Sequence, residues 1–307
     1  SPLTYDAARQ RVVLFAGKDT WSALPAETWE YDGVTWTQAL PASSPPTRAG
    51  HALAYDPTRQ RVVLFGGQVS TTDLLDAWEY DGTTWSPVAT PGALTARRLA
   101  PLAPDPVGGG LVLFGGISGA ATYRQETWRY DGAAWTQLAP VTSPPARASH
   151  AAFVDPTRGQ LVIAGGQYGS PGTFADTWAL GAGTWERVIQ VPLARRNAAL
   201  VLDEARGRLV MFGGRTPSTA SAETWEFDGA GWTLVTPVTT PAARHGHVMA
   251  YDSARQVTVM FGGNGGEFPG PTWEYDGADW TPVTTATRPF DYVSDAAMAY
   301  DALRQRM

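Results

Sequence analysis

The chain contains no cysteine, one lysine and only four histidines among its 307 residues. The missing cysteines exclude disulfides, thiolate metal ligands and thiol nucleophiles. No apolar stretch approaches the roughly 20 residues of a membrane-spanning helix, so we expect no membrane insertion. Phosphate-binding loops, zinc-protease motifs and nucleophile elbows are also missing, and we expect no cofactor and no metal. The net charge of −6 argues against a nucleic-acid partner.

The basic residues are almost all arginine, with Lys18 as the one exception, a bias typical of GC-rich bacterial genomes. No signal peptide is visible from Ser1, which fits either a mature secreted chain or a cytoplasmic one. Threonine-rich spacers and plain turns are typical of secreted components. We therefore expect a bacterial protein with an extracellular or periplasmic location rather than a cytoplasmic one.

Tryptophan, by contrast, is abundant and periodic. Six times a tryptophan is followed seven residues later by another, at Trp29/Trp36, Trp78/Trp85, Trp128/Trp135, Trp178/Trp185, Trp225/Trp232 and Trp273/Trp280. The pairs recur every 47 to 50 residues, and a fixed period of this length indicates a propeller or a solenoid. Each unit buries its apolar face only by stacking on its neighbours.

One repeat reads as four short strands. Residues 51–56 alternate in polarity, 61–65 form a continuous apolar run, and 77–80 and a segment opening at Trp85 complete the unit. Paired glycines end the second strand, since glycine permits close backbone approach. Asp81-Gly82 predicts a tight turn with positive φ between the last two strands.

These motifs resemble kelch repeats over essentially the whole chain. The features that carry the resemblance are Arg-Ala-Gly-His at 48–51, the Trp pairs, and the Gly-Gly pairs at 66–67, 115–116, 165–166, 213–214 and 262–263. The resemblance implies an all-β fold, a β-propeller of four-stranded antiparallel blades with the first strand innermost. The resemblance says little about function, because kelch propellers include adaptors, lectin-like modules and some enzymes.

Six Trp-pair units predict six blades in a single domain over residues 1–307. The aspartate of the first turn nevertheless occurs seven times, the last at Asp301. Residues 296–307 are therefore expected to close the ring against blade 1, replacing or flanking the segment 3–5, which removes exposed edges. A seven-bladed ring is the alternative.

Twelve of the 13 tryptophans fall on repeat positions, and we expect them to fill the space between blades rather than to bind sugars or bases. A ring without helices needs large apolar fillers, and each buried indole contributes about 5 kcal/mol gross. Trp21 is the exception, because it lies outside the repeat register in a variable loop.

The two ends of each blade differ in sequence. One end carries the near-identical Asp-Pro-Thr-Arg and Tyr-Asp-Gly turns, which are typical of structural turns. The other end carries segments that vary between repeats: 18–26, 68–75, 117–125, 167–175, 215–222 and 264–271. Loops on a rigid scaffold are where binding usually occurs, so any site is expected on this variable-loop face.

Two charges recur at this end. Five arginines lie eight residues before a turn aspartate, and five carboxylates lie two residues before a first tryptophan: Arg48, Arg97, Arg147, Arg195 and Arg244, and Glu27, Asp76, Glu126, Asp176 and Glu223. An anion-binding ring of arginines is one interpretation. We favour pairing with the carboxylates or with loop carbonyls, as exposed pairs that fix register and contribute about 0–1 kcal/mol each.

His51, His150 and His247 share one position on the predicted innermost strand. Units with Ala100 and Ala198 intervene, so three imidazoles are not expected to converge on a metal. His245 lies outside this register.

The last repeat departs from both charge patterns, with Pro271 and Val293 at the carboxylate and arginine positions. Charged and aromatic residues that the repeat does not require gather in this blade and in blade 1, which follows it across the closure. We predict that they contribute to binding, although irregular closure alone also accounts for them. The candidates are Lys18, Asp19, Trp21, His245, Glu267, Phe268, Arg288, Phe290, Asp291 and Tyr292.

Three function classes remain. We favour a non-catalytic binding or scaffold propeller that recognises a protein, a peptide or a carbohydrate. A secreted structural or surface component is the second. An enzyme is the third class. The missing cysteine excludes galactose-oxidase-like chemistry, and no Glu-x3-Asp-x3-His iron motif occurs. A sialate-epimerase-like isomerase remains, with these acid–base candidates: Glu267, Arg288, Asp291, Tyr292 and His245.

Overall fold

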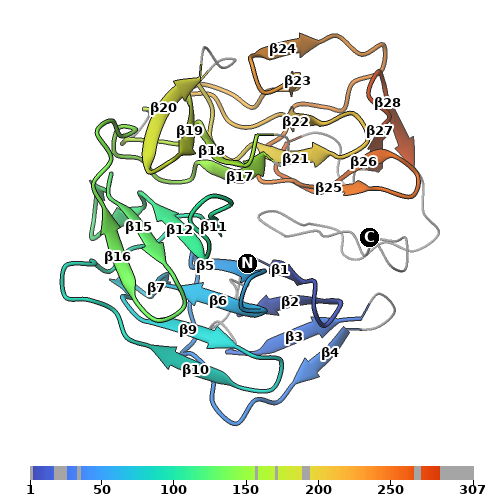
Figure 1. Ribbon diagram of the computed structural model, residues 1–307. Coiled ribbons are helices and arrows are strands. Elements are labelled where there is room, and N and C mark those ends of the chain that lie inside the picture. The colour runs from blue at the N-terminus through green and yellow to red at the C-terminus, as the bar shows by residue number, and fades with distance from the viewer. Residues whose placement is uncertain are drawn as a thin grey trace. The chain divides into compact units, whose positions relative to one another are not determined.

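The computed structural model describes residues 3–16, 26–32, 36–155, 158–169, 172–188, 194–265 and 271–283. These residues form six four-stranded antiparallel sheets, the blades of a β-propeller (Figure 1). The predicted fold class and the predicted six blades are confirmed. The segment 296–307, expected to close the ring, lies outside the described residues.

Blades 1 to 3 follow one another directly along the chain, and the strands of each are hydrogen-bonded in chain order. Blade 1 consists of β1 (Leu3–Asp6), β2 (Arg11–Phe15), β3 (Thr28–Tyr31) and β4 (Trp36–Ala39). Blade 2 consists of β5 (Ala52–Asp56), β6 (Arg61–Phe65), β9 (Ala77–Tyr80) and β10 (Trp85–Val88). Blade 3 consists of β11 (Leu102–Pro104), β12 (Leu111–Phe114), β15 (Thr127–Tyr130) and β16 (Trp135–Leu138).

Blades 4 to 6 repeat this order. Blade 4 consists of β17 (Ala151–Asp155), β18 (Gln160–Ala164), β19 (Thr177–Gly181) and β20 (Thr184–Val188). Blade 5 consists of β21 (Ala199–Asp203), β22 (Arg208–Phe212), β23 (Thr224–Phe227) and β24 (Trp232–Val235). Blade 6 consists of β25 (Val248–Asp252), β26 (Val257–Phe261), β27 (Thr272–Tyr275) and β28 (Trp280–Val283).

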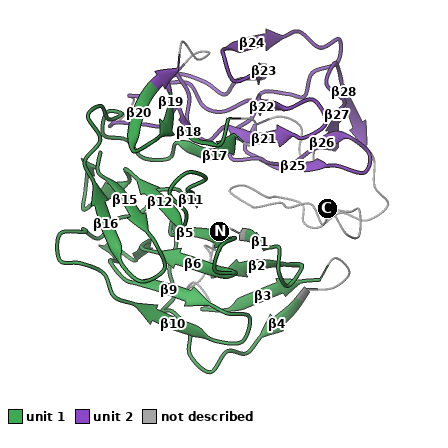
Figure 2. Ribbon diagram, viewed as in Figure 1, with its two compact units in different colours: residues 1–162, 178–186 green, residues 163–177, 187–307 purple. Residues whose placement is uncertain are grey.

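The chain divides into two compact units, one of residues 1–162 and 178–186, the other of residues 163–177 and 187–307 (Figure 2). In the first unit, β1 lies beside β5, β5 beside β11 and β11 beside β17. In the second unit, β21 lies beside β25. The first strands of successive blades are thus neighbours, which confirms that the first strand is the innermost one.

The recurring aspartates shape both turns of a blade. In blade 2, Oδ1 of Asp56 accepts the backbone N–H groups of Thr58 and Arg59 at 2.9 and 3.2 Å. Oδ1 of Asp81 accepts those of Thr83 and Thr84 at 2.8 and 2.9 Å. A short acceptor side chain satisfies turn N–H groups that have no strand partner. Gly82, as predicted, has positive φ (97°).

The second tryptophans whose side chains the structure describes, Trp85, Trp135, Trp185, Trp232 and Trp280, lie at the joints between blades. Trp85 lies on Tyr80 of its own blade with ring centroids 5.0 Å apart, and meets the edge of Phe15 in the preceding blade at 5.3 Å. Its indole N–H donates to the Thr28 hydroxyl at 2.9 Å. Trp135, Trp185 and Trp280 are buried in the same way, and Trp232 is half-buried.

The first tryptophans are less enclosed. Trp128 is buried, whereas Trp29, Trp78, Trp178, Trp225 and Trp273 are half-buried. The prediction that the indoles pack between blades is confirmed for the described tryptophans of the second set. It holds less well for the first set, most of which is half-buried.

Candidate functional site

The variable loops begin from a repeated backbone frame. In blade 2, Gly67 accepts a hydrogen bond from the N–H of Leu74 at 2.8 Å and donates its own N–H to the carbonyl of Arg97 at 2.9 Å. The N–H of Arg97 in turn donates to the Leu74 carbonyl at 3.2 Å. Because Arg97 leads into blade 3, this triangle ties each loop to the next blade. The same triangle recurs at Gly116/Arg124/Arg147, Gly166/Phe174/Arg195 and Gly214/Ser221/Arg244.

Close approach explains both glycines of the Gly-Gly pair. A Cβ on Gly66 would lie 2.4 Å from the carbonyl oxygen of Arg97 in the next blade. A Cβ on Gly67 would lie 2.9 Å from the Cβ of His51 in its own blade. Both residues have positive φ, which a side chain disfavours. The first glycine therefore serves the joint between blades, and the second serves packing within the blade.

The recurring arginines complete this frame with their side chains. Nη1 and Nη2 of Arg48 donate to the two carboxylate oxygens of Asp76, each at 2.6 Å. Nη1 also donates to the Gly66 carbonyl at 2.9 Å, and Nε to that of Pro46 at 3.0 Å. The bidentate geometry matches a guanidinium to a carboxylate. Burial raises the pKa of Asp76, but the hydrogen bonds from Arg48 and Trp78 outweigh it and leave that pKa below its usual value.

Arg97 and Arg195 repeat the arrangement with Glu126 and Glu223. Burial lowers the pKa of both guanidinium groups, while the glutamates counteract it. The expected pairing with carboxylates and carbonyls is thus confirmed at these three positions. The expectation that the pairs are exposed was wrong. All five arginines are buried, Arg48 and Arg147 completely, because each fills the space between a strand end and its connection.

The carboxylates also bind the first tryptophans. The indole N–H of Trp78 donates to Asp76 at 2.6 Å, and that of Trp225 to Glu223 at 3.0 Å. The buried N–H groups of Trp128 and of Trp273, where Pro271 occupies the carboxylate position, have no hydrogen-bond partner in the described part of the chain. The charged residues at this end are therefore largely used for structure, and the loop tips carry what is left for binding.

A second set of backbone hydrogen bonds joins residues that directly precede the first strands of neighbouring blades. The N–H of Leu99 donates to the carbonyl of Gly50 at 2.8 Å, and that of Ser149 to the carbonyl of Leu99 at 3.0 Å. In the second unit, Gly246 donates to Asn197 at 2.9 Å. All five residues have φ between 54° and 66°, a region that disfavours bulky side chains. Leu99 is 39% exposed, so a strained, solvent-facing leucine marks this end of blade 3.

The loop tips differ from blade to blade. In blade 2, β7 (Gln68–Val69) and β8 (Thr72–Asp73) form a two-stranded ribbon, and in blade 3, β13 (Ile117–Ser118) and β14 (Thr122–Tyr123) form another. Their tips consist of small, exposed residues, 70–72 and 119–122. In blade 4 the tip presents an aromatic ring instead: Tyr168 is 53% exposed and lies 4.6 Å from Phe174 between centroids.

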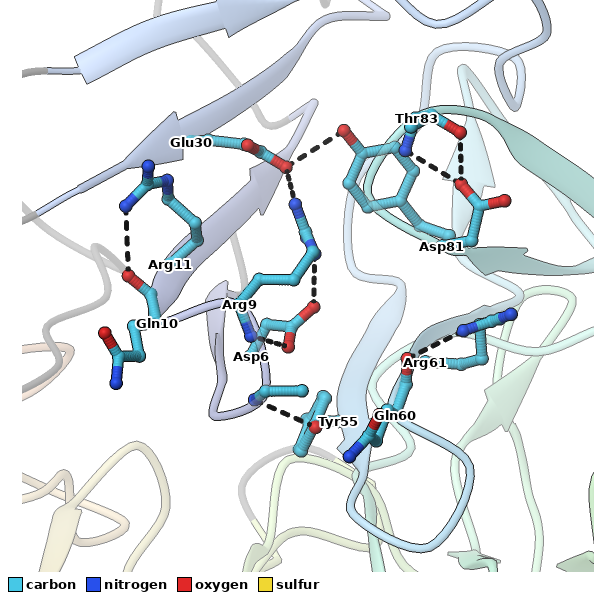
Figure 3. Close-up of polar contacts among 12 residues, drawn as sticks. Asp6, Arg9, Gln10, Arg11, Glu30, Tyr55, Gln60, Arg61, Asp81 and Thr83 are labelled. Atoms are coloured by element: carbon cyan, nitrogen blue, oxygen red, sulfur yellow. Dashed lines mark hydrogen bonds and ion pairs between the residues drawn. The ribbon is translucent and has the colours of Figure 1, made fainter.

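The opposite end of the blades is more uniform. Arg9 lies between Asp6 and Glu30, with its Nε 2.7 Å from Asp6 and its Nη1 2.6 Å from Glu30 (Figure 3). The Tyr80 hydroxyl of the next blade donates to the same Glu30 oxygen at 2.9 Å. Its pKa is raised by burial and by this carboxylate.

The quartet of Asp, Arg, Glu and Tyr recurs twice more, as Asp56/Arg59/Glu79/Tyr130 and Asp203/Arg206/Glu226/Tyr275. In blade 3, Gly108 and Arg129 stand at the arginine and glutamate positions, and Arg129 donates to Asp105 at 2.9 Å. These turns thus connect neighbouring blades, as expected for structural turns.

The three histidines of the inner strands are buried and do not form a metal site. Each ring meets the edge of a phenylalanine in the preceding blade, as His51 does with Phe15 at 5.9 Å. Desolvation lowers the pKa of each to about 3, with the nearby Arg48, Arg147 or Arg244 adding to the effect. Among the described residues there is no group of three or more metal-ligating side chains.

Of the ten predicted binding residues, the structure describes only His245. It is half-buried and exchanges backbone hydrogen bonds with Asn264 at 3.0 and 2.8 Å. Lys18, Asp19, Trp21, Glu267, Phe268, Arg288, Phe290, Asp291 and Tyr292 lie outside the described residues, and their assignment stays a prediction. The described part of the chain forms no helix long and apolar enough to cross a membrane.

The repeated frame, the Trp-filled joints and the four-stranded blades define a kelch-type β-propeller. The family model described as the KLHDC2/KLHL20/DRC7 Kelch-repeats domain matches residues 3–188 and 105–301. The chain belongs to the kelch-repeat family, whose propellers typically mediate protein binding. No curated protein matches the chain.

Sequence reasoning did not single out Arg196, Arg215, Leu99 or Tyr168. In blade 5, Arg196 and Arg215 lie directly opposite each other in an antiparallel bridge. A signal for this pair was present, because segments 187–197 and 213–222 contain arginine and no carboxylate. Among the described residues, the pair does not recur in the other blades, so the periodicity of the chain does not reveal it.

Proposed function

We propose that this propeller is a binding module that recognises a protein or peptide partner through its variable loops. The observation that carries the proposal is the contrast between base and tip within each loop. The bases share one hydrogen-bonded triangle in four blades, whereas the tips range from a small polar ribbon to an exposed tyrosine. A rigid base lowers the entropy cost of ordering a loop on binding.

The recurring arginines near the loop bases have their charge satisfied within the fold, which supports the same proposal. The recurring arginines donate to carbonyls and carboxylates of their own blades, so they leave the tips to determine specificity. The family supports a protein partner, because kelch propellers typically bind proteins. Tyr168 fits this function, since tyrosine is enriched among the residues that dominate binding energy at protein interfaces.

Selection of displayed peptides on the whole chain tests the proposal. Blade 3 offers a matched pair of variants, because Ala121 and Ala133 are both exposed but lie in a loop tip and in the opposite turn, respectively. Ala121→Arg and Tyr168→Ser should weaken the selected peptides at least about ten-fold, whereas Ala133→Arg should leave affinity unchanged.

Two results contradict the proposal. One is a set of peptides that lose affinity with Ala133→Arg and not with the two loop variants. The other is a selection without enrichment. A glycan array measured in parallel examines carbohydrate as the ligand class.

A further inference from the structure

The connection that leads into blade 5 and the variable loop of blade 5 carry arginines but no carboxylates that would balance their charge. Segments 187–197 and 213–222 contain Arg187, Arg195, Arg196 and Arg215, and no aspartate or glutamate, in a chain with a net charge of −6. Arg195 is used by Glu223, and Arg187 lies on the outer strand β20. Arg196 and Arg215 remain at the base of the variable loop.

These two arginines are held against each other by the backbone. The N–H of Arg196 donates to the Arg215 carbonyl at 3.0 Å, and the N–H of Arg215 donates back at 2.8 Å. Directly opposed residues of an antiparallel pair have Cβ atoms about 4.5–5.5 Å apart on one face, and like charges there are destabilising. The other isolated bridges that start a variable loop, Ala49↔Gln68, Arg98↔Ile117 and His245↔Asn264, do not oppose two arginines.

Blade 3 has an arginine at the same position, and there its charge is neutralised. Nη1 of Arg98 forms an ion pair with Asp73 of the preceding loop at 2.5 Å and also donates to the Gly119 carbonyl at 3.2 Å. The pair is mostly enclosed, with side chains 18% and 6% exposed. Asp73 also accepts the Gly119 N–H, so the charge is balanced within the fold.

In blade 5 the balancing carboxylate is replaced by threonine. Leu74 and Phe174 donate equivalent hydrogen bonds to Gly67 and Gly166, both at 2.8 Å, so Thr173 occupies the position of Asp73. Arg196 instead donates to the neutral amide oxygen of Gln167 at 2.8 Å. Among the residues that the structure describes, its other hydrogen bonds are the backbone bonds to Arg215, which is exposed and forms no ion pair with a described carboxylate.

A second observation marks the same place. The hydroxyl oxygen of Thr173 is buried and has no hydrogen-bond partner among the residues that the structure describes. A buried hydroxyl without a partner costs free energy unless a water or a ligand satisfies it. Arg196 reaches the Gln167 amide, Gln167 lies opposite Thr173 in a backbone bridge, and Arg215 lies opposite Arg196, so these four residues are neighbours where the equivalent joint has a carboxylate.

We propose that Arg196 and Arg215 form a subsite for the carboxylate side chains of an acidic segment in the protein partner. The proposal rests on the proposed function and names the partner chemistry at one loop. Guanidinium groups present paired donors that match carboxylates. A protein side chain is favoured over a small free anion because Arg215 is exposed at the loop base, where a large partner reaches it.

Arrayed twelve-residue peptides test the subsite. Each peptide carries two glutamates at a defined separation, from adjacent to six residues apart, and is matched by a peptide with glutamines instead. We expect the whole chain to bind at least one glutamate peptide and to bind its glutamine counterpart at least about ten-fold more weakly. The double variant Arg196→Gln/Arg215→Gln should lose at least about ten-fold in affinity for the glutamate peptide.

Two further variants separate a local site from general charge. Arg158 and Arg187 are exposed elsewhere, so Arg158→Gln/Arg187→Gln removes the same charge and should leave peptide affinity nearly unchanged. Thr173→Asp restores the carboxylate of blade 2 while keeping both arginines. It should pair with Arg196, raise the melting temperature and weaken the glutamate peptide.

The outcomes distinguish the two proposals. Equal losses in both double variants, an unchanged affinity with Thr173→Asp, or binding of inorganic phosphate without any peptide binding would overturn the acidic subsite. If display selection yields peptides that need the variable loops but contain no acidic residue, the binding function stands and the subsite fails. If neither selection nor array yields a binder, both fail.

Discussion

The joint between blades 1 and 2 and the joint between blades 2 and 3 use the same positions with different residues. In both joints a phenylalanine of the earlier blade meets a tryptophan of the later one, Phe15 with Trp85 at 5.3 Å and Phe65 with Trp135 at 5.1 Å. Both joints also carry the quartet in which a tyrosine hydroxyl reaches the preceding blade's glutamate.

Three other positions differ. The first joint has His51 directly before the innermost strand β5, and the second has Ala100 shortly before β11. The indole of Trp85 donates to Thr28, whereas that of Trp135 faces Ala77 and is buried without a partner among the described residues. The loop base carries Ala49 in the first joint and the arginine of the Arg98–Asp73 pair in the second.

The comparison teaches that aromatic packing and the arginine frame are the shared requirement of a joint. The polar residues around them vary, and each variation changes one measurable property. The histidine introduces acid sensitivity, the threonine satisfies an indole, and the loop-base residue alters the surface available to a partner.

Acidification should have the largest effect, at the joints that contain histidine. Burial lowers the pKa of His51, His150 and His247 to about 3, while an unfolded histidine titrates near 6.5. The unfolded state therefore binds more protons between these values, and stability falls as pH drops through about 6.5 toward 3. From pH 7.5 to 5 the loss should be about 2 kcal/mol per histidine.

Urea unfolding at pH 7.5, 6 and 5 measures this slope. The triple variant that places alanine at the three positions, as at Ala100 and Ala198, provides the control and should have a flatter dependence. An equally steep slope in that variant would assign the acid sensitivity to the carboxylates instead.

Removal of a frame arginine should have the next largest effect. Arg48→Met keeps the apolar stem but removes the guanidinium donor of the Gly66 and Pro46 carbonyls and leaves Asp76 with the Trp78 indole as its side-chain donor. Breaking one partner of such a buried network should cost about 3 kcal/mol of unfolding free energy. Arg61→Met provides a control outside the frame, and an equal loss there would contradict a specific role for Arg48.

Exchange of the indole acceptor should have a smaller effect, with opposite signs in the two joints. Thr28→Ala should lower stability by about 1–2 kcal/mol, because the buried N–H of Trp85 loses its partner. Ala77→Thr should raise stability by about 1 kcal/mol by supplying Trp135 with the acceptor that its counterparts have. Thermal unfolding of both variants measures this, and a destabilised Ala77→Thr would show that the joint has no room for the added methyl group.

The smallest effect is expected at the strained leucine. Leu99→Gly should relieve the left-handed backbone and raise stability by about 0.5 kcal/mol, after the entropy cost of glycine is subtracted. Leu40→Gly provides the control, because Leu40 is exposed without positive φ and should be slightly destabilised. Loss of affinity in Leu99→Gly for peptides selected on the whole chain would add Leu99 to the binding surface.

The repeat itself could be predicted because each unit reuses the same spacing. The strands at 61–65 and 77–80, the glycine turn at Gly82 and the pairing of Arg48 with Asp76 all follow from local pattern or from one-to-one matching along the chain. The burial of Arg48 could not be predicted, because it depends on how a strand end meets the connection that precedes it.

The candidate site shows the same division. Nine of the ten predicted binding residues lie outside the described residues, so that prediction stays open. The sequence showed the arginines of blade 5 only as segments that contain arginine and no carboxylate. Nothing in the spacing reveals that Arg196 and Arg215 exchange hydrogen bonds.

The order of strands within a blade and the recurrence of the second tryptophan are determined by the chain alone, since they depend on periodicity and on residue size. The tertiary structure decided which charges are neutralised. Arg98 and Arg196 occupy equivalent positions along the chain, and only the fold shows that one meets Asp73 and the other meets an amide. Electrostatic balance depends on distances across the joint between blades, and those distances arise only when the blades assemble.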